Sequence, residues 1–208
     1  MTERVSWYDR HVLPHLIDLG CGLPLIAAQR QKVIPQAAGR VLEIGIGTGL
    51  NLRFYDKGKV RSLVAVEPAG QMHALAQRRS AQAGIPVELH ALSAERLPLE
   101  SGSFDCVVCT YTLCSIDDPV AALREMRRVL RPAGQLLFAE HGLAPDADVA
   151  RWQRRVEPYW SRIAGGCRLT RDVPLLLKEA GFRANDEQGY VSRPRLLHYQ
   201  FWGSASAP

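Results

Sequence analysis

Val41-Leu42-Glu43-Ile44-Gly45-Ile46-Gly47-Thr48-Gly49 is the stretch of this sequence that decides the fold. Its apolar start predicts a fully buried strand. Its alternate glycines predict a sharp turn whose backbone lies close to a ligand, because glycine has no Cβ and readily adopts positive φ. The residues from Leu50 to Tyr55 are then expected to begin a helix. A strand, a glycine-rich turn and a helix, in that order, are typical of α/β sheets that bind nucleotide-like ligands.

The composition indicates one soluble, globular domain. A chain of 208 residues is long enough to bury a substantial core. Hydrophobic residues make up 47% of it and charged residues 23%, the balance usual for a water-exposed surface around an apolar interior. The sequence has no apolar run of about 18 residues, so we expect no transmembrane segment. Met1–Trp7 lacks the apolar core of a signal peptide, which predicts a cytoplasmic protein.

The net charge of +5 does not by itself indicate nucleic acid as a partner. The basic residues are scattered rather than clustered, and the pairs Arg78-Arg79, Arg127-Arg128 and Arg154-Arg155 fall on predicted helices. We interpret these pairs as solvated helix faces, so no nucleic acid is expected to bind. This charge is compatible with a weak electrostatic field around the protein that attracts an anionic substrate or draws the protein to a membrane surface.

The five cysteines predict neither a disulfide framework nor a metal site. Cys106 and Cys109 have C-x-x-C spacing, but they lie inside an apolar strand. Side chains three residues apart on a strand point to opposite faces, so these two thiols are expected to be small core residues. No second cysteine pair of this spacing accompanies them. We therefore expect no metal.

Strands and helices alternate through the middle of the chain, which predicts a doubly wound, mainly parallel α/β sheet. The strands expected there are Val41–Ile44, Ser62–Val66, Val87–His90, Phe104–Cys109 and Gln135–Glu140. Three helices are expected between them. The first begins near Leu50, the second runs from about Ala69 to Ala83 and stops at Gly84, and the third starts after Asp118 as N-cap.

Helices are predicted on both sides of this core, and two further strands complete a seven-stranded sheet. The flanking helices are expected at about Tyr8–Ile17, Pro24–Val33, Asp146–Ile163 and Thr170–Ala180, the last with Thr170 as N-cap. Strands at about Ala184–Val191 and Leu196–Trp202 are expected to pair as a C-terminal antiparallel hairpin. The single domain would comprise a helical cap (1–36), a cofactor-binding core (37–142) and an acceptor-side region (143–208).

Two carboxylates indicate the chemistry of the ligand. Glu67 ends the second strand about 20 residues after the glycines, where an acidic residue accepts hydrogen bonds from both hydroxyls of a ribose. Glu43 lies beside the glycine turn, where it would repel a phosphate and attract a cation. The pair therefore favours a positively charged adenosyl ligand over a nicotinamide dinucleotide.

Five motifs between Arg40 and Gly142 resemble, in order and spacing, those of the class I S-adenosylmethionine-dependent methyltransferases, especially the ubiquinone/menaquinone-biosynthesis type and its small-molecule relatives. The motifs are Glu43–Gly49, Val64–Pro68, Ala94–Pro98, Phe104–Val107 and Arg128–Gly134. Two positions depart from the family: Ser93 stands where an Asp is frequent, and Ala133 where a Gly is common. The resemblance implies a Rossmann-like methyltransferase fold and S-adenosylmethionine as cofactor. The residues predicted to bind it are Glu43, Gly45, Gly47, Gly49, Asn51, Glu67, Pro68, Met72, Ser93, Ala94, Glu95, Thr110, Tyr111 and Ser115.

A narrower resemblance concerns the methyl acceptor. Gly49–Tyr55, Leu113–Ser115, Glu140-His141 and Gly165–Arg171 are similar to the branch that includes thiol S-methyltransferases of animal membranes. A thiol is therefore one acceptor to consider, beside a quinone-like ring or a lipid headgroup of the kind that bacterial phospholipid N-methyltransferases modify. His141 follows the fifth strand and is the candidate general base. Trp152, Tyr159 and Trp160 either wall an apolar acceptor pocket or pack in the core.

The predicted activity is methyl transfer to a small molecule by in-line displacement. The alternatives are a regulatory protein that binds S-adenosylmethionine without turnover, a phospholipid methyltransferase and an RNA methyltransferase. The last is disfavoured because no RNA-binding domain and no N/D-P-P-Y motif occurs in the sequence. The sequence predicts neither which acceptor atom is methylated nor the oligomeric state.

Overall fold

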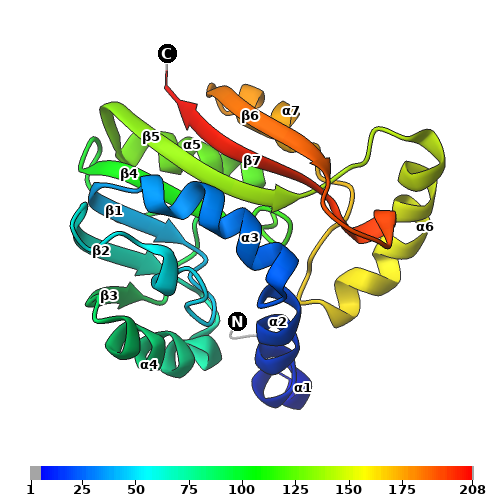
Figure 1. Cartoon of the computed structure of the whole chain (residues 1–208), viewed down its shortest axis with the longest axis horizontal. Coiled ribbons are helices and arrows are strands. Elements are labelled where there is room, and N and C mark those ends of the chain that lie inside the picture. Colours follow the sequence, from blue (N-terminus) through cyan, green and yellow to red (C-terminus); the bar gives the residue numbers. More distant parts are fainter. Residues whose placement is uncertain (1–5, 208) are drawn as a thin grey trace.

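A computed structural model describes residues 6–207 and shows a single seven-stranded sheet in the order β3-β2-β1-β4-β5-β7-β6 (Figure 1). Residues 1–5, which belong to the predicted helical cap and to the stretch expected to lack a signal-peptide core, and Pro208 lie outside the described range. The strands are β1 (Gly39–Ile44), β2 (Val60–Val66), β3 (Val87–His90), β4 (Phe104–Thr110), β5 (Leu130–His141), β6 (Arg183–Tyr190) and β7 (Tyr199–Ser206). Strands β1 to β5 pair in parallel, whereas β7 runs antiparallel to both β5 and β6. The predicted Rossmann-like sheet and its C-terminal hairpin are confirmed.

Helices cover both faces of the sheet, and each face buries its own apolar core. In Figure 1, α3 (Pro24–Val33) crosses the front of the sheet, while α5 (Pro119–Val129) and α7 (Val173–Glu179) lie behind it. Successive strand residues alternate between the two cores because a strand has a two-residue side-chain period. Cys106 lies in the core that α3 shares with α4 (His73–Ala83), and Cys109 in the core under α5 and α7. The prediction that these thiols face opposite sides is confirmed.

Residues 7–21 form two helices where the sequence predicted a single one at Tyr8–Ile17, whereas α3 lies where it was expected. Helix α1 (Trp7–His11) begins with a capping box between Ser6 and Asp9, and α2 (Leu13–Cys21) follows after Val12. Pro14 does not interrupt α2, because it lies in the first turn of that helix, where a missing N–H costs no intrahelical bond. In Figure 1, α2 stands beside the carboxyl ends of β1 and β2, and α6 (Ala147–Ile163) lies on the other side of α2.

Three predicted helix starts were wrong, and in two of them side chains make bonds that the sequence did not reveal. Leu50–Tyr55 forms turns and a short 3₁₀ helix (Leu52–Phe54), since Asn51 and Tyr55 bond to the buried Glu43. A 3₁₀ turn, Gly70–Met72, precedes α4, which ends as predicted at the left-handed Gly84. Helix α7 starts after Asp172, whose side chain caps Leu175 N–H, whereas Thr170 bonds to Glu157 in α6.

Four predicted strand starts also moved. Strands β1 and β2 each begin two residues earlier than predicted, and β5 begins at Leu130 instead of Gln135. Strand β7 begins at Tyr199 instead of Leu196 because residues 195–197 form a 3₁₀ turn. Ala133, which replaces the family's usual glycine, has a φ of 66°. None of the helices formed by residues 6–207 combines the length and the apolar character needed to span a lipid bilayer.

Candidate active site

The carboxyl ends of β1, β2 and β4 open into a cavity of about 450 Å³, which we call the first cavity. This is the edge at which doubly wound sheets bind ligands. Most residues predicted to bind the cofactor line it: Gly45, Gly47, Glu67, Pro68, Met72, Ser93, Ala94, Glu95, Thr110, Tyr111 and Ser115. Glu43, Gly49 and Asn51 do not belong to its lining. The sequence motifs therefore converge on one cavity, with three of the predicted residues lying behind its wall.

The glycines of the turn have different roles, although all three have positive φ. A Cβ added to Gly45 would lie 2.3 Å from the Thr112 methyl carbon, so packing requires this glycine. A Cβ on Gly49 would lie 2.8 Å from Leu52, again inside the protein. A Cβ on Gly47 would meet nothing closer than 4.0 Å. Gly47 thus keeps space free on the cavity side, where a ligand can approach the backbone.

Glu67 presents a fixed carboxylate to the first cavity. Its Oε2 accepts the Gly47 N–H at 3.0 Å and its Oε1 accepts the Ala69 N–H at 2.9 Å. Burial raises the pKa of this carboxyl, and the two N–H groups oppose that rise. Each carboxylate oxygen has a second lone pair. The side chain is therefore held with acceptor capacity to spare, as the predicted contact with two ribose hydroxyls requires.

Arg30 of α3 reaches the first cavity and was missed by the sequence analysis. Its guanidinium donates to Asn51 Oδ1 and to Thr110 Oγ1, both at 2.6 Å, and lies over the Tyr111 ring at 4.8 Å from the centroid. It is 5% exposed and lines the cavity. A guanidinium binds carboxylates well, so this position suits the carboxylate of an amino acid. No spacing signal pointed to it, because Arg30 precedes the glycine motif on a separate helix.

Glu43 supports Arg30 from behind the cavity wall. It is 1% exposed, its Oε2 accepts the Tyr55 hydroxyl at 2.7 Å, and its Oε1 accepts Asn51 Nδ2 at 2.9 Å. Burial raises the pKa of Glu43, while the bonds from Tyr55 and Asn51 and the charge of Arg30 lower it. Glu43 and Asn51 therefore reach the cavity through Arg30, and not as wall residues.

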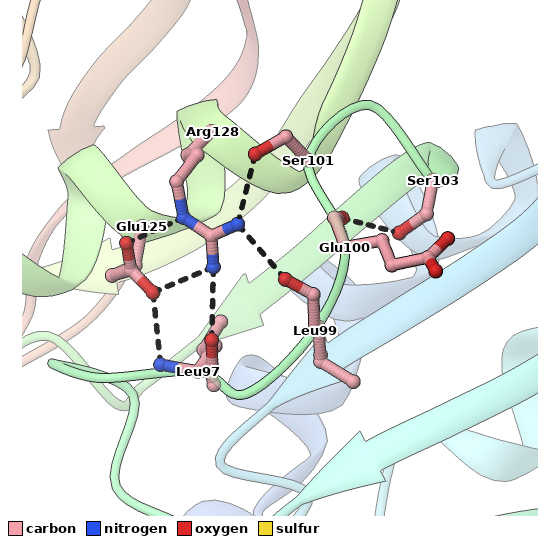
Figure 2. Close-up of polar contacts among 7 residues, drawn as sticks. All are labelled: Leu97, Leu99, Glu100, Ser101, Ser103, Glu125 and Arg128. Carbon is pink, nitrogen blue, oxygen red and sulfur yellow. Dashed lines mark hydrogen bonds and ion pairs between the residues drawn. The ribbon is translucent and has the colours of Figure 1, made fainter.

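Arg128 fixes the loop at Leu97 and Leu99 (Figure 2), directly after Ser93, Ala94 and Glu95 in the chain. Its guanidinium donates to the carbonyl oxygens of Leu97 at 2.9 Å and Leu99 at 2.8 Å. Glu125 bonds to the same guanidinium and accepts the Leu97 N–H at 2.8 Å. The interpretation of Arg128 as a solvated helix residue was wrong. It connects α5 to the loop expected to contact adenine.

A second cavity of about 430 Å³ adjoins the first and has a mostly apolar wall. The residues that line both cavities are Leu13, Ile17, Cys21, Tyr111, Ser115 and Gly165. Tyr111 has a φ of 53°, rare for a bulky residue, and its hydroxyl donates to Gln200 Oε1 at 2.8 Å. Trp160 lines the second cavity, whereas Trp152 and Tyr159 are 58% and 70% exposed, so those two neither wall the pocket nor pack in the core.

The predicted base His141 lines the second cavity beside two cysteines. Its Nε2 lies 3.1 Å from Cys167 Sγ, which also accepts the Trp160 indole N–H at 3.3 Å. A hydrogen bond from Cys114 lowers the pKa of the Cys167 thiol well below its ordinary range, and His141 and Trp160 act in the same direction. Burial opposes a charge on His141, yet the adjacent thiolate raises its pKa. The arrangement places a thiol that ionises readily in contact with an imidazole nitrogen at the wall of the second cavity.

Comparison with known proteins agrees with this geometry. Residues 42–138 match a family described as a methyltransferase domain. Human thiol S-methyltransferase TMT1B is 39% identical over 157 residues, which are 73% of this chain and 64% of that protein. The chain belongs to the class I S-adenosylmethionine-dependent methyltransferases.

Further comparisons of this chain support both its family and its fold. Human thiol S-methyltransferase TMT1A is 34% identical over 171 residues, 80% of this chain and 65% of that protein. The chain thus spans slightly less than two thirds of the length of either human relative. A possible histamine N-methyltransferase from Thermotoga maritima superposes with a TM-score of 0.66 at 22% identity, over 97% of this chain and 98% of that one. That likeness shows the shared fold, and S-adenosylmethionine is the cofactor of the class.

Proposed function

We propose that this methyltransferase transfers the sulfonium methyl group of S-adenosylmethionine to the sulfur of a small apolar thiol. The observation that carries the proposal is the junction of two cavities at Tyr111 and Ser115, with polar groups suited to the cofactor on one side and an apolar wall with a cysteine–histidine cluster on the other. The names of two relatives at 39% and 34% identity, both thiol S-methyltransferases, support the same acceptor class.

The proposed pose of the cofactor follows the charges of the first cavity. The adenine lies against the loop at Ser93–Glu95, the ribose hydroxyls donate to Glu67, and the amino-acid carboxylate pairs with Arg30. Gly47, which has no side chain, allows the cofactor to approach the backbone closely between the ribose and the amino-acid part. The sulfonium methyl then points past Tyr111 and Ser115 into the second cavity.

The proposed reaction needs alignment more than it needs activation. The methyl carbon is already bound to a sulfonium, so the protein must hold acceptor sulfur, methyl carbon and leaving sulfur in line. Such orientation supplies on the order of 7–11 kcal/mol. An ordinary thiol has a pKa of about 8.5, so roughly a few per cent of the acceptor is thiolate at pH 7 and modest help suffices to deprotonate the rest. We assign the acceptance of its proton to the His141–Cys167 pair, which lines the cavity that the acceptor would occupy.

The test is turnover of S-adenosylmethionine to S-adenosylhomocysteine with matched acceptors. Thiophenol and phenol have nearly the same shape and differ in the reacting atom, so we expect methylation of the thiol and little of the phenol. A demethylated quinone and a phosphatidylethanolamine dispersion serve as the competing acceptor classes. Preferential methylation of phenol, quinone or headgroup would contradict the proposal. Cofactor binding without turnover on any acceptor would favour a regulatory protein.

A further inference from the structure

Three potential metal ligands meet at the wall of the second cavity, and each comes from a different part of the chain. Cys114 follows β4, His141 ends β5, and Cys167 lies in the loop between α6 and α7. One donor atom from each side chain lies within 4.8 Å of the other two. Across residues 6–207, no second group of three His, Cys, Asp or Glu side chains gathers this closely. The expectation of no metal rested on Cys106 and Cys109 and on sequence spacing, which cannot reveal a cluster of this kind.

The geometry points to a site for a soft divalent cation, with zinc the best fit, held by Cys114, His141 and Cys167 and open at its fourth position toward the second cavity. Two thiolates and an imidazole form a donor set that zinc prefers. In a tetrahedral zinc site the N and S donors lie roughly 3.5 Å apart, given bonds of about 2.0 and 2.3 Å. His141 Nε2 and Cys167 Sγ are 3.1 Å apart, so only a small outward shift would admit the ion.

The surroundings of the cluster suit such an ion. The Trp160 indole N–H donates to Cys167 Sγ at 3.3 Å, a bond that would orient a thiolate ligand. The Arg168 N–H donates to the Cys114 carbonyl at 2.9 Å, which ties the two cysteine-bearing segments together. Among residues 6–207, no carboxylate lines the second cavity, so the described part of its wall lacks the oxygen ligands that magnesium or calcium require. Three protein ligands with an open position are the arrangement of catalytic zinc rather than of structural zinc.

This inference rests on the proposed function and gives the cluster a chemical role in it. The acceptor thiol would bind at the open position as a thiolate and release its proton to solvent. Its sulfur then forms a bond to the methyl carbon while the bond from that carbon to the sulfonium sulfur breaks, and the leaving sulfur keeps the electron pair. The products are a methyl thioether, S-adenosylhomocysteine and one proton. His141 would act as a ligand in this state, and coordination would replace it as the means of deprotonation.

Cobalt(II) is the spectroscopic probe for this site. We expect the reduced, chelator-treated chain to bind one equivalent of cobalt, with a thiolate-to-cobalt charge-transfer band and the visible bands of a tetrahedral ion. Cys167→Ser, Cys114→Ser and His141→Ala should each lose that spectrum. Cys21→Ser should keep that spectrum, because Cys21 lies outside the cluster although it also lines the two cavities. Circular dichroism checks that each variant is folded. Cys167 and His141 are less buried than Cys114, so their variants keep the test valid if the Cys114 variant does not fold.

The outcomes separate the metal site from the proposed function. An alkanethiol added to the cobalt form should shift the visible bands, and zinc should restore thiol methylation to the chelated protein. Absence of a stoichiometric cobalt spectrum, or its persistence in Cys167→Ser, overturns the site. Thiol methylation that continues at full rate in metal-free protein also overturns the inference and leaves the proposed function standing. Stoichiometric cobalt binding without methylation of any thiol supports the site and overturns the function on which its role rests.

Discussion

At the scale of single residues, Asp105 shows how one carboxylate stabilises the edge of the sheet opposite the active site. It accepts the Arg40 N–H and Arg61 Nη2, both at 2.7 Å, and pairs with Arg131. These bonds lower its pKa from 3.8 to about 2, the Arg40 N–H having the largest effect. A depressed carboxyl pKa adds stability above the unfolded value of 3.8, and that stability is lost as the pH falls toward 2.

Asp105→Asn is therefore expected to lower the free energy of unfolding by about 2 kcal/mol at pH 7 and by roughly half as much at pH 3. Denaturant unfolding at the two pH values measures the difference. Asp56→Asn is the control, because Asp56 is 46% exposed and forms one long ion pair, with Lys59 at 3.7 Å. Equal losses for Asp105→Asn at both pH values would show that the carboxylate charge is not the cause.

Two glycines of one turn should respond differently to the same substitution. Gly47→Ala places a methyl group toward open cavity, so we expect a folded protein that has lost at least 10-fold in affinity for S-adenosylmethionine. Its positive φ adds about 1–2 kcal/mol of backbone strain. Gly45→Ala places the methyl group 2.3 Å from Thr112, so its main effect should be on stability. Calorimetric titration and thermal unfolding of both variants separate these effects, and unchanged cofactor affinity in Gly47→Ala would exclude close approach at this position.

At the scale of secondary-structure elements, α5 determines the position of a loop that has no regular structure of its own. Arg128 bonds to two carbonyl oxygens of that loop and to Glu125, with 34% of its side chain exposed. Removing the guanidinium leaves those carbonyls without their donor. We expect Arg128→Met to lower the free energy of unfolding by about 1–3 kcal/mol and to weaken cofactor binding several-fold, because the loop walls the first cavity.

Arg127→Met provides a matched control one residue away. Arg127 is exposed and makes one long bond, to the Gly181 carbonyl at 3.4 Å. Its loss should change neither cofactor affinity nor stability by more than about 0.5 kcal/mol. If the two variants bind S-adenosylmethionine equally well, the loop does not depend on the Arg128 contacts for its bound position.

The elements that the sequence predicted well are those whose signals are local. Alternating apolar strands, Asp118 at the start of α5 and Gly84 at the end of α4 all depend on neighbours within a few residues. The helix expected at Leu50 failed because the Asn51 and Tyr55 side chains bond to Glu43, a contact that only the folded chain creates. Arg30 and the Cys114–His141–Cys167 cluster were unpredictable for the same reason, since the sheet brings together residues from distant segments.

At the scale of the whole molecule, the N-terminal helices and the sheet share one binding site. Leu13, Ile17 and Cys21 of α2 line both cavities, so α2 must stay in place for either ligand to be enclosed. A polar connection helps to hold it, beside the packing of Leu13 and Ile17: Asp18 accepts the Thr48 hydroxyl at 2.6 Å and pairs with Arg79 of α4. Arg79 also donates to the Thr48 carbonyl at 2.9 Å. The glycine turn, α2 and α4 thus meet at a single carboxylate.

Asp18→Asn should therefore speed release of the cofactor more than it destabilises the fold. The Asp18 and Arg79 side chains are 28% and 30% exposed, so the charge is partly screened and the loss of stability should stay near 1 kcal/mol. Loosening α2 destabilises the closed, cofactor-bound site. We therefore expect the dissociation rate of S-adenosylmethionine to rise roughly 10-fold, with little change in the association rate. Stopped-flow displacement measures both rates, with Glu88→Gln, an exposed carboxylate paired to His90, as the control. An unchanged dissociation rate would mean that α2 encloses the cofactor without the Asp18 connection, and that its packing through Leu13 and Ile17 suffices.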